Sequence, residues 1–211
     1  MFQKITRRNL DTFLERYATE RKALDIGAGG SSYGRFFPNR LTVDVDPMRK
    51  PDVVADAHSL PFKDEEFEYI ICTEVLEHLK NPAKAISEMK RVLKNDGTLI
   101  LTTRFVYPTH DSPNDYWRFT KYGLQELFKD WNILELIPET RTFSTIGVLL
   151  QRIAFQTRLR ADKPVKLILF ILAYIFDHMN FLIKQEYGDI KRATKEEAIM
   201  PSGYYLVCKK K

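Results

Sequence analysis

Residues 22–30 (KALDIGAGG) constrain the fold of this chain more than any other stretch. A short apolar run ends at Asp25 and passes into a turn that contains Gly27, Gly29 and Gly30. Glycine tolerates positive φ and lacks the Cβ that would keep a bound molecule away from the backbone. The pattern predicts a strand that leads into a tight turn beside a ligand. Dinucleotide sites, phosphate sites and structural turns share it, so the following segments must decide between them.

The segments after this turn alternate between apolar runs and amphipathic stretches. We expect further strands at residues 41–45, 53–55, 67–73, 98–103, 132–137 and 203–208, and helices at 6–17, 82–93 and 120–130, with a short helix capped by Ser31 or Ser32 that ends at Pro38. Residues 67–73 (FEYIICT) are nearly all apolar, which is typical of a strand covered on both faces. The order predicts an α/β fold with a doubly wound, seven-stranded, mostly parallel sheet.

Residues 141–199 exceed what such a sheet needs. The predicted organisation is a sheet domain of residues 1–140 plus 200–211, with a basic, apolar helical insertion at 141–199 before the last strand. The centre of the insertion, residues 167–176 (LILFILAYIF), is apolar on all sides but shorter than the about 20 residues that span a bilayer. Three roles stay open for the insertion: a lid, a homodimer or core contact, or a peripheral membrane contact through residues 164–184.

The charge of the chain is unevenly distributed. The formal net charge is +5, and residues 141–211 contain 13 Lys and Arg against 6 Asp and Glu, which leaves −2 for the rest. A basic segment can face anionic lipid, nucleic acid or an acidic sugar, or it can simply be solvated.

Two features predict a cytoplasmic protein. Both cysteines, Cys72 and Cys208, lie in apolar strand-like runs, which favours buried thiols in a reducing compartment. The N-terminal stretch MFQKITRRNLDTFLERY carries charge and lacks the apolar core that a secretory signal needs.

Acidic residues follow three successive predicted strands. Asp25, Asp44 and Asp56 stand at the carboxyl ends of these strands, and in an open α/β sheet the ligand lies across those ends. Asp44 is placed to accept hydrogen bonds from ribose hydroxyls, and Asp56 precedes an apolar LPF segment where an adenine edge can be read. Any one of them could be a loop or helix cap, but three in register predict a nucleoside site.

These motifs together resemble the class I S-adenosylmethionine-dependent methyltransferases, in particular their small-molecule group with a Rossmann-like sheet. The matching segments are residues 25–31 (DIGAGGS), 43–47 (VDVDP), 56–62 (DAHSLPF), 74–79 (EVLEHL) and 91–103 (RVLKNDGTLILTT). The resemblance covers residues 20–140 and the last strand. Ser31 departs from the family pattern, which has a third glycine there, and the helix between the second and third strands is nearly absent.

The resemblance implies that the chain binds S-adenosylmethionine and releases S-adenosylhomocysteine. By this resemblance Gly27, Ala28 and Gly29 would pass under the methionine part, Asp25 would orient its amino group through water, Asp44 would bind the ribose, Asp56 and the backbone of Ala57 the adenine, and the Cys72 carbonyl the methionine ammonium. NAD oxidoreduction is the competing interpretation of the turn, but the glycine spacing does not fit GxxxGxG.

Residues 107–120 (YPTHDSPNDYWRFT) follow the carboxyl end of the fifth strand, where the acceptor should lie. His110 is the candidate general base, Asp115 would orient it or substitute for it, and Arg118 would hold a carboxylate or phosphate. Similar segments occur in bacterial methyltransferases that are suspected of acting on sugars or other polar metabolites. Alternatively, Asp115 and Arg118 pair with each other and the segment packs onto the following helix.

Glu74, Glu77 and His78 form an ExxEH pattern, which on a helix would place all three side chains on one face. Together with His110 they would form a Mg²⁺ site, as similar segments do in small-RNA 2′-O-methyltransferases and ubiquinone-pathway O-methyltransferases. The alternative is an ordinary helix start with an acidic residue near its N-terminus and a packed histidine.

The expected function is methyl transfer from S-adenosylmethionine to a small polar or lipid-linked acceptor, most simply at oxygen. Two alternatives stay open: a non-catalytic S-adenosylmethionine-binding partner protein, and an RNA methyltransferase. Nucleic acid is disfavoured because no basic strand interleaved with aromatic residues is visible.

Overall fold

The structure is a computed structural model, and it describes residues 3–30 and 33–211. The chain folds into two compact units. The helical unit contains the residues up to Phe13, Phe105–Pro108 and Pro138–Gly203, and the sheet unit contains Leu14–Arg104, Thr109–Ile137 and Tyr204–Lys211.

The strands and helices have the following bounds. The seven strands of the main sheet are β1 Ala23–Ile26, β2 Arg40–Asp44, β3 Val53–Val54, β4 Phe67–Thr73, β5 Leu93–Arg104, β6 Trp131–Pro138 and β9 Gly203–Lys210. A separate antiparallel pair consists of β7 Glu186–Asp189 and β8 Thr194–Glu196. The helices are α1 Ile5–Glu15, α2 Pro82–Val92, α3 Lys121–Leu127, α4 Thr142–Gln156 and α5 Asp162–His178, with 3₁₀ turns at Tyr33–Arg35, Pro47–Arg49, Leu76–His78 and Met179–Leu182.

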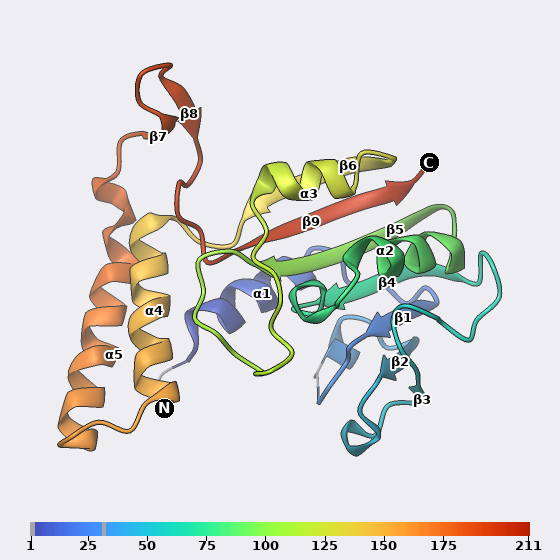
Figure 1. The fold of residues 1–211 in the computed structure, drawn as a ribbon, viewed down its shortest axis with the longest axis horizontal. Coiled ribbons are helices and arrows are strands. Elements are labelled where there is room, and N and C mark those ends of the chain that lie inside the picture. The colour runs from blue at the N-terminus through green and yellow to red at the C-terminus, as the bar shows by residue number, and fades with distance from the viewer. Residues whose placement is uncertain (1–2, 31–32) are drawn as a thin grey trace. The chain divides into compact units, whose positions relative to one another are not determined.

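The main sheet has the strand order β3-β2-β1-β4-β5-β9-β6. The pairs β1–β2, β2–β3, β1–β4 and β4–β5 are parallel, while the arrows of β9 and β5 in Figure 1 point in opposite directions. The chain runs outward from β1 to β3 and then resumes at β4 on the other side of β1. This confirms the predicted doubly wound, mostly parallel sheet and puts the switch point, where such folds bind ligands, between β1 and β4.

The centre of the sheet is covered on both faces. Ile70, Ile71 and Cys72 are consecutive in β4 and all 0% exposed, although successive side chains of a strand point to opposite faces. The nearly continuous apolar run that predicted such a strand is therefore confirmed. Removing a buried Ile side chain such as Ile71 beyond Cβ would cost about 2–5 kcal/mol.

The local helix signals predict the cap of α3 but not the lengths of the short helices. Thr120 caps α3 as predicted, because its Oγ1 accepts a hydrogen bond from Gly123 N at 3.1 Å, but α3 ends at Leu127. The predicted caps Ser31 and Ser32 lie outside the described residues, and the segment that follows them is a single 3₁₀ turn, Tyr33–Arg35.

Helix α5 is longer than the ten-residue apolar run that predicted it. It begins at Asp162, and a 3₁₀ turn continues it to Leu182. By length and composition alone, Asp162–Leu182 could cross a membrane, which corrects the prediction that this segment is too short, although a single helix of this kind is weak evidence. Charged residues flank the apolar run 167–176 on both sides, and both are paired: Lys166 Nζ lies 3.0 Å from Asp162, and Asp177 pairs with Arg8.

Candidate functional site

The glycine turn after β1 adopts the backbone conformation that its sequence predicts. Gly27 and Gly29 have φ of 67° and 52°, in the left-handed region. A Cβ on Gly27 would lie 2.2 Å from Cγ2 of Val75, whereas a Cβ on Gly30 would meet no atom of the described residues within 4 Å. Gly27 is therefore required by packing, and the described residues leave open space beside Gly30.

Asp44, the last residue of β2, holds this turn in place. Its Oδ2 accepts a hydrogen bond from Gly29 N and its Oδ1 one from Asp46 N, each at 2.9 Å. A carboxylate oxygen has two lone pairs, so each oxygen can accept one more hydrogen bond. The half-buried side chain thus fixes the turn and keeps acceptor capacity for the ribose hydroxyls that its predicted role requires.

Asp25 lies in β1 and is 1% exposed. Its Oδ2 lies 3.1 Å from Nε of Arg40, the first residue of β2. Burying a carboxylate without a partner is costly, so this ion pair explains how β1 tolerates a charge. The sequence had not indicated Arg40; the only signal was its place at the start of the neighbouring strand. The water-mediated role of Asp25 at the cofactor stays a prediction.

Asp56 follows β3 and is exposed. Its Oδ1 accepts a hydrogen bond from His58 N at 2.9 Å and lies 2.6 Å from His58 Nδ1, while His58 Nε2 accepts from Asn81 N at 3.2 Å. The backbone N–H of His58 is the main cause that lowers the pKa of Asp56. Asp56 is therefore ionised at neutral pH and held next to the buried Ala57. Sequence reasoning did not single out His58 or Asn81.

Cys72 lies in β4, opposite Ile26 of β1 and Leu101 of β5. Burial raises the pKa of its thiol above the ordinary value, so the sulfur stays protonated. Only its backbone carbonyl was predicted to act, and that role stays a prediction. Because β3, β2, β1 and β4 are neighbours in the sheet, Asp25, Asp44 and Cys72 lie in the carboxyl halves of adjacent strands, and Asp56 follows the carboxyl end of β3.

A second group of side chains surrounds Glu77. Glu77 is 0% exposed, and its Oε2 accepts a hydrogen bond from Thr103 Oγ1 at 2.7 Å. Its Oε1 is buried, has no hydrogen-bond partner among the described residues, and lies 4.0 Å from His110 Nε2. Burial raises the pKa of Glu77 above its ordinary value, because a low-dielectric environment disfavours the charged form.

His110 and His78 lie edge to face, with ring centroids 4.7 Å apart. His78 Nδ1 lies 2.6 Å from the carbonyl oxygen of Asn114, so Nδ1 carries a proton and donates a hydrogen bond to this oxygen. Burial, followed by the neighbouring His78, lowers the pKa of His110. The His110 imidazole is therefore neutral near pH 7, which is the state that a general base or a metal ligand needs.

Asp115 and Arg118 pair with each other, as the alternative interpretation of this segment predicted. Two guanidinium nitrogens of Arg118 lie 2.6 and 2.7 Å from the Asp115 carboxylate, and this pairing is the main cause that lowers the pKa of Asp115 to about 2. Asp115 Oδ2 also accepts a hydrogen bond from His110 N at 3.0 Å and lies 3.6 Å from His110 Nδ1. Arg118, Asp115 and His110 thus form one chain of contacts.

The rest of the DYWRFT segment is structural. Trp117 Nε1 donates a hydrogen bond to the carbonyl oxygen of Leu79 at 2.8 Å, and the Trp117 ring stacks on Phe119 at 6.4 Å. Phe119 is buried. These contacts fix the loop that holds Asp115 and Arg118.

The predicted helical ExxEH face does not form. Glu74 has a left-handed φ of 57°, and only Leu76–His78 make a 3₁₀ turn. Glu74 N donates to Thr102 O at 3.0 Å, which prolongs the pairing of β4 with β5, and the Glu74 carboxylate pairs with the buried Arg104. Because its carboxylate pairs with Arg104, Glu74 does not lie with the other predicted metal ligands. Arg104, which sequence reasoning missed, is 30 residues away in the chain.

Glu77, His78 and His110 remain together, with ligand atoms that lie within 4.8 Å of one another. This set offers one carboxylate and two imidazoles, whereas Mg²⁺ prefers six oxygen ligands. Imidazole and carboxylate in combination suit zinc, iron or nickel better. The residues present therefore do not support the predicted Mg²⁺ site.

Comparison with known proteins supports the family that the motifs predicted. Residues 24–101 match a family model described as a methyltransferase domain. The demethylmenaquinone methyltransferase of Renibacterium salmoninarum is 37% identical over 103 residues, which is 42% of this chain and 43% of that protein.

Two solved structures share the fold. A putative methyltransferase from Bacillus halodurans superposes with a TM-score of 0.56 at 16% identity, over 94% of this chain and 97% of that chain. The cyclase SpnF superposes with a TM-score of 0.62 at 17% identity, over 97% and 81%. Such low identities establish the fold alone, and the presence of a cyclase means that the fold does not fix the reaction.

The chain spans less than half the length of the curated relatives that it matches, for example 47% and 38% of two proteins from Methanocaldococcus jannaschii. The residues matched by the family model, 24–101, contain the glycine turn and the strands β2, β3 and β4. The matched residues, the motifs and the strand order together support a class I S-adenosylmethionine-dependent methyltransferase.

Proposed function

We propose that this protein transfers the methyl group of S-adenosylmethionine to a hydroxyl group of a small polar or lipid-linked acceptor. The observation that carries the proposal is the convergence of the open glycine turn with Asp25, Asp44 and Asp56 at the carboxyl ends of three adjacent strands. The matched relative from Renibacterium salmoninarum is a demethylmenaquinone methyltransferase, which supports a lipid-linked acceptor.

The residues of the sheet unit would hold the cofactor from several sides. Asp44 would accept the ribose hydroxyls, Asp56 and the backbone of Ala57 would bind the adenine, and the Cys72 carbonyl would accept from the ammonium group. Gly27, Ala28 and Gly29 would line the methionine part, with Asp25 acting through water. S-adenosylmethionine supplies an electrophilic methyl group, and much of the acceleration comes from holding the acceptor in line with it.

His110 is the proposed base. Its neutral imidazole would take the proton from the acceptor hydroxyl at Nε2. Asp115, 3.6 Å from Nδ1, would stabilise the imidazolium that forms, and Arg118 would keep Asp115 ionised and in position. A carboxylate or phosphate on the acceptor would have to share the Arg118 guanidinium with Asp115.

Calorimetric titration of the full chain with S-adenosylmethionine and S-adenosylhomocysteine tests the cofactor assignment. We expect Asp44→Asn to weaken binding of both by roughly tenfold or more, because it removes charge-assisted hydrogen bonds from the ribose and loosens the glycine turn. The matched control is Asp52→Asn. The carboxylate of Asp52 accepts a hydrogen bond at 2.8 Å from the backbone N–H of Thr42, which lies on the same strand as Asp44. Equal losses in both variants would contradict the ribose assignment.

A screen of phenolic and polyol acceptors with labelled cofactor separates an enzyme from a non-catalytic partner protein. An enzyme transfers label to at least one acceptor class. A non-catalytic partner protein would bind the cofactor but transfer no label by itself. Label would then be transferred only when a second subunit is added. Transfer of label to RNA would support the third alternative.

A transition-metal site at Glu77, His78 and His110 is a second candidate, favoured by the buried Oε1 of Glu77. In that case His110 would be a ligand and not a base. Titration with Zn²⁺, Mn²⁺ and Mg²⁺ tests this: a site of this composition prefers Zn²⁺, and Glu77→Gln abolishes the heat of binding. Absence of binding for all three ions would eliminate the metal.

A further inference from the structure

One face of helix α5 is apolar and exposed along its length. Leu167, Ile168, Ile171, Leu172 and Ile175 are 38–55% exposed, and positions 168, 171 and 175 recur at the i, i+3 and i+7 spacing of a single helical stripe. Phe181 and Leu182, in the following 3₁₀ turn, are 81% and 57% exposed. Soluble proteins rarely expose so continuous an apolar surface unless it binds something.

The opposite face of α5 is packed within the helical unit. Ala173 is buried, and a Cβ on Gly147 of α4 would lie 2.7 Å from the Ala173 carbonyl oxygen, which indicates a close approach of the two helices. Phe155 and Phe170 lie 5.3 Å apart between ring centroids. Figure 1 shows α4 and α5 side by side along most of their length. The helix therefore cannot turn its apolar stripe inward without losing this packing.

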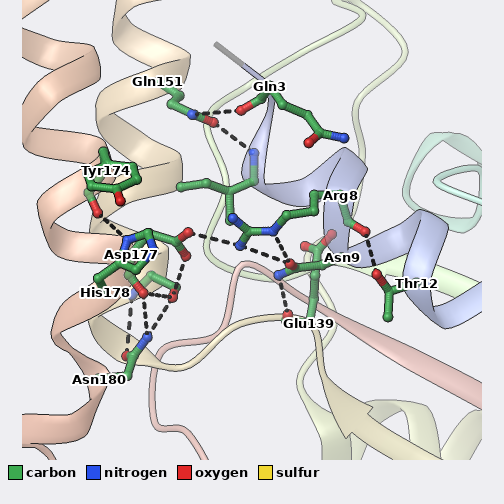
Figure 2. Close-up of polar contacts among 12 residues, drawn as sticks. Gln3, Arg8, Asn9, Thr12, Glu139, Gln151, Tyr174, Asp177, His178 and Asn180 are labelled. Atoms are coloured by element: carbon green, nitrogen blue, oxygen red, sulfur yellow. Dashed lines mark hydrogen bonds and ion pairs between the residues drawn. The ribbon is translucent and has the colours of Figure 1, made fainter.

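Polar contacts fix the C-terminal end of α5, as Figure 2 shows. The Asp177 side chain, 7% exposed, lies 2.9 Å from Nη2 of Arg8 in α1 and accepts a hydrogen bond from Ser144 Oγ at 2.8 Å. Asn180 Nδ2 donates to Ser144 Oγ at 2.6 Å. A helix held by such contacts lies flat on its unit, which favours contact with a membrane surface over crossing the membrane.

Basic residues surround the N-terminal end of the stripe. Residues 158–166 contain four basic residues and one acidic residue, which gives this segment a net charge of +3. The basic residues are Arg158, Arg160, Lys163 and Lys166, and the acidic one is Asp162. No charged residue interrupts residues 167–176. An apolar stripe with Lys and Arg beside it is the pattern of helices that lie in the interface of an anionic bilayer.

Aromatic side chains add a third feature of such helices. Tyr174 is 62% exposed beside the stripe, and Tyr187, in β7, is 41% exposed. Tyrosine rings prefer the boundary between headgroups and acyl chains, where the ring is buried and the hydroxyl stays hydrated.

From these observations we infer that α5 binds the protein to the surface of an anionic phospholipid bilayer. The stripe Leu167–Ile175 enters the acyl boundary, and the cluster Arg158, Arg160, Lys163 and Lys166 contacts the lipid phosphates. The inference does not depend on the proposed methyl transfer, because binding to lipid requires neither cofactor nor turnover.

Flotation of the full chain with vesicles tests the inference. We expect binding to vesicles of phosphatidylcholine with 30% phosphatidylglycerol (about one anionic lipid in three), weaker binding to pure phosphatidylcholine, and a decrease with salt. Ile171→Glu should weaken the partition by roughly tenfold or more, because it places a charge in the acyl boundary. The matched control is Leu134→Glu on β6, where Leu134 is 53% exposed, and it should leave the partition unchanged.

A second pair of variants tests the basic cluster. Replacing Arg158, Arg160 and Lys163 together by Gln should weaken binding to the anionic vesicles on the order of a hundredfold and hardly affect the neutral ones. Replacing the exposed Arg21, Lys80 and Lys94 of the sheet unit by Gln removes the same charge and should have a far smaller effect. Circular dichroism and S-adenosylmethionine titration verify that each variant is folded.

Three results would overturn the inference. The first is no binding to either kind of vesicle. The second is a concentration-dependent dimer in ultracentrifugation that Ile171→Glu dissolves, since the stripe would then contact a second copy. The third is release of the protein from membranes by detergent but not by carbonate, which would mean that α5 crosses the bilayer.

Discussion

The sheet unit and the helical unit treat their apolar side chains differently. In the sheet unit, the central strands are covered on both faces, so that Leu24, Ile70 and Ile71 are completely buried. In the helical unit, α5 has Ala173 buried, and its other described residues are half-buried or exposed. The central strands of the sheet unit thus bury their apolar side chains within the unit, whereas α5 of the helical unit leaves apolar side chains exposed to solvent or to a binding partner.

The two units also use buried charge for different purposes. Around the candidate site, Glu77 is buried and His110 is half-buried, and the pKa values of both are shifted toward the neutral forms, as is common where side chains take part in chemistry. In the helical unit, the Asp177 side chain, which is 7% exposed, pairs with Arg8 and holds a helix in place. We therefore propose chemistry in the sheet unit and attachment in the helical unit, and separate variants can test each proposal.

The largest expected effect concerns His110. His110→Ala should lower turnover by roughly ten- to ten-thousandfold with little change in the affinity for S-adenosylmethionine, because it removes a base that acts only on the acceptor proton. His178→Ala, in the helical unit, is the control and should turn over normally. Steady-state kinetics with the best acceptor of the screen measures both. Full turnover in His110→Ala would remove this residue from the mechanism and favour an acceptor that needs no base.

The next effect is on the stability of the helical unit. Asp177→Ala should loosen α5 by about 1–3 kcal/mol, because it removes the ion pair with Arg8 and the side-chain hydrogen bond from Ser144 at the helix end. Hydrogen exchange of the α5 amides should accelerate, while exchange in β4 and cofactor affinity should stay unchanged. Arg8→Ala and the double variant complete a cycle that isolates the pair. Faster exchange throughout β4 would show that the two units are not independent.

The central strands could be predicted from sequence because their signals are local. Apolar runs bounded by turn residues located all seven strands of the main sheet, and the glycine turn with its three aspartates predicts the side on which the cofactor binds. The ion pair of Asp25 with Arg40 could not be predicted in this way, since it depends on which strands become neighbours and in which register.

The failures have the same physical origin. The ExxEH segment carries a helical pattern, but Glu74 is drawn into a left-handed turn by its pairing with Thr102 and Arg104, which come from another strand. The apolar run that predicts helix α5 stops at Lys166 and Asp177, whereas the helix continues through both residues, whose charges pair with Asp162 and Arg8. In both cases, side chains distant in sequence override the local pattern.

The smallest expected effect is a dependence of stability on pH in the sheet unit. The pKa of Glu77 is raised in the folded state, so its contribution to stability is complete below the unfolded value, near 4.5, and is lost as the pH rises through the folded pKa. The pKa of Asp115 is lowered to about 2, so its contribution is present above about 3.8 and is lost as the pH falls toward 2. The two groups therefore act in opposite directions.

Urea unfolding between pH 4 and pH 8, in the presence of a chelator, separates the two contributions. Glu77→Gln imitates the protonated carboxyl group, so its stability relative to the original protein should rise as the pH increases. Asp115→Asn should be less stable than the original protein by a nearly constant amount over the same range, because Asp115 stays ionised throughout it. If Glu77→Gln instead lost stability with increasing pH, the Glu77 carboxylate would be stabilised in its charged form. That result would favour a bound cation or a proton held by His110 in place of a neutral, buried carboxyl group.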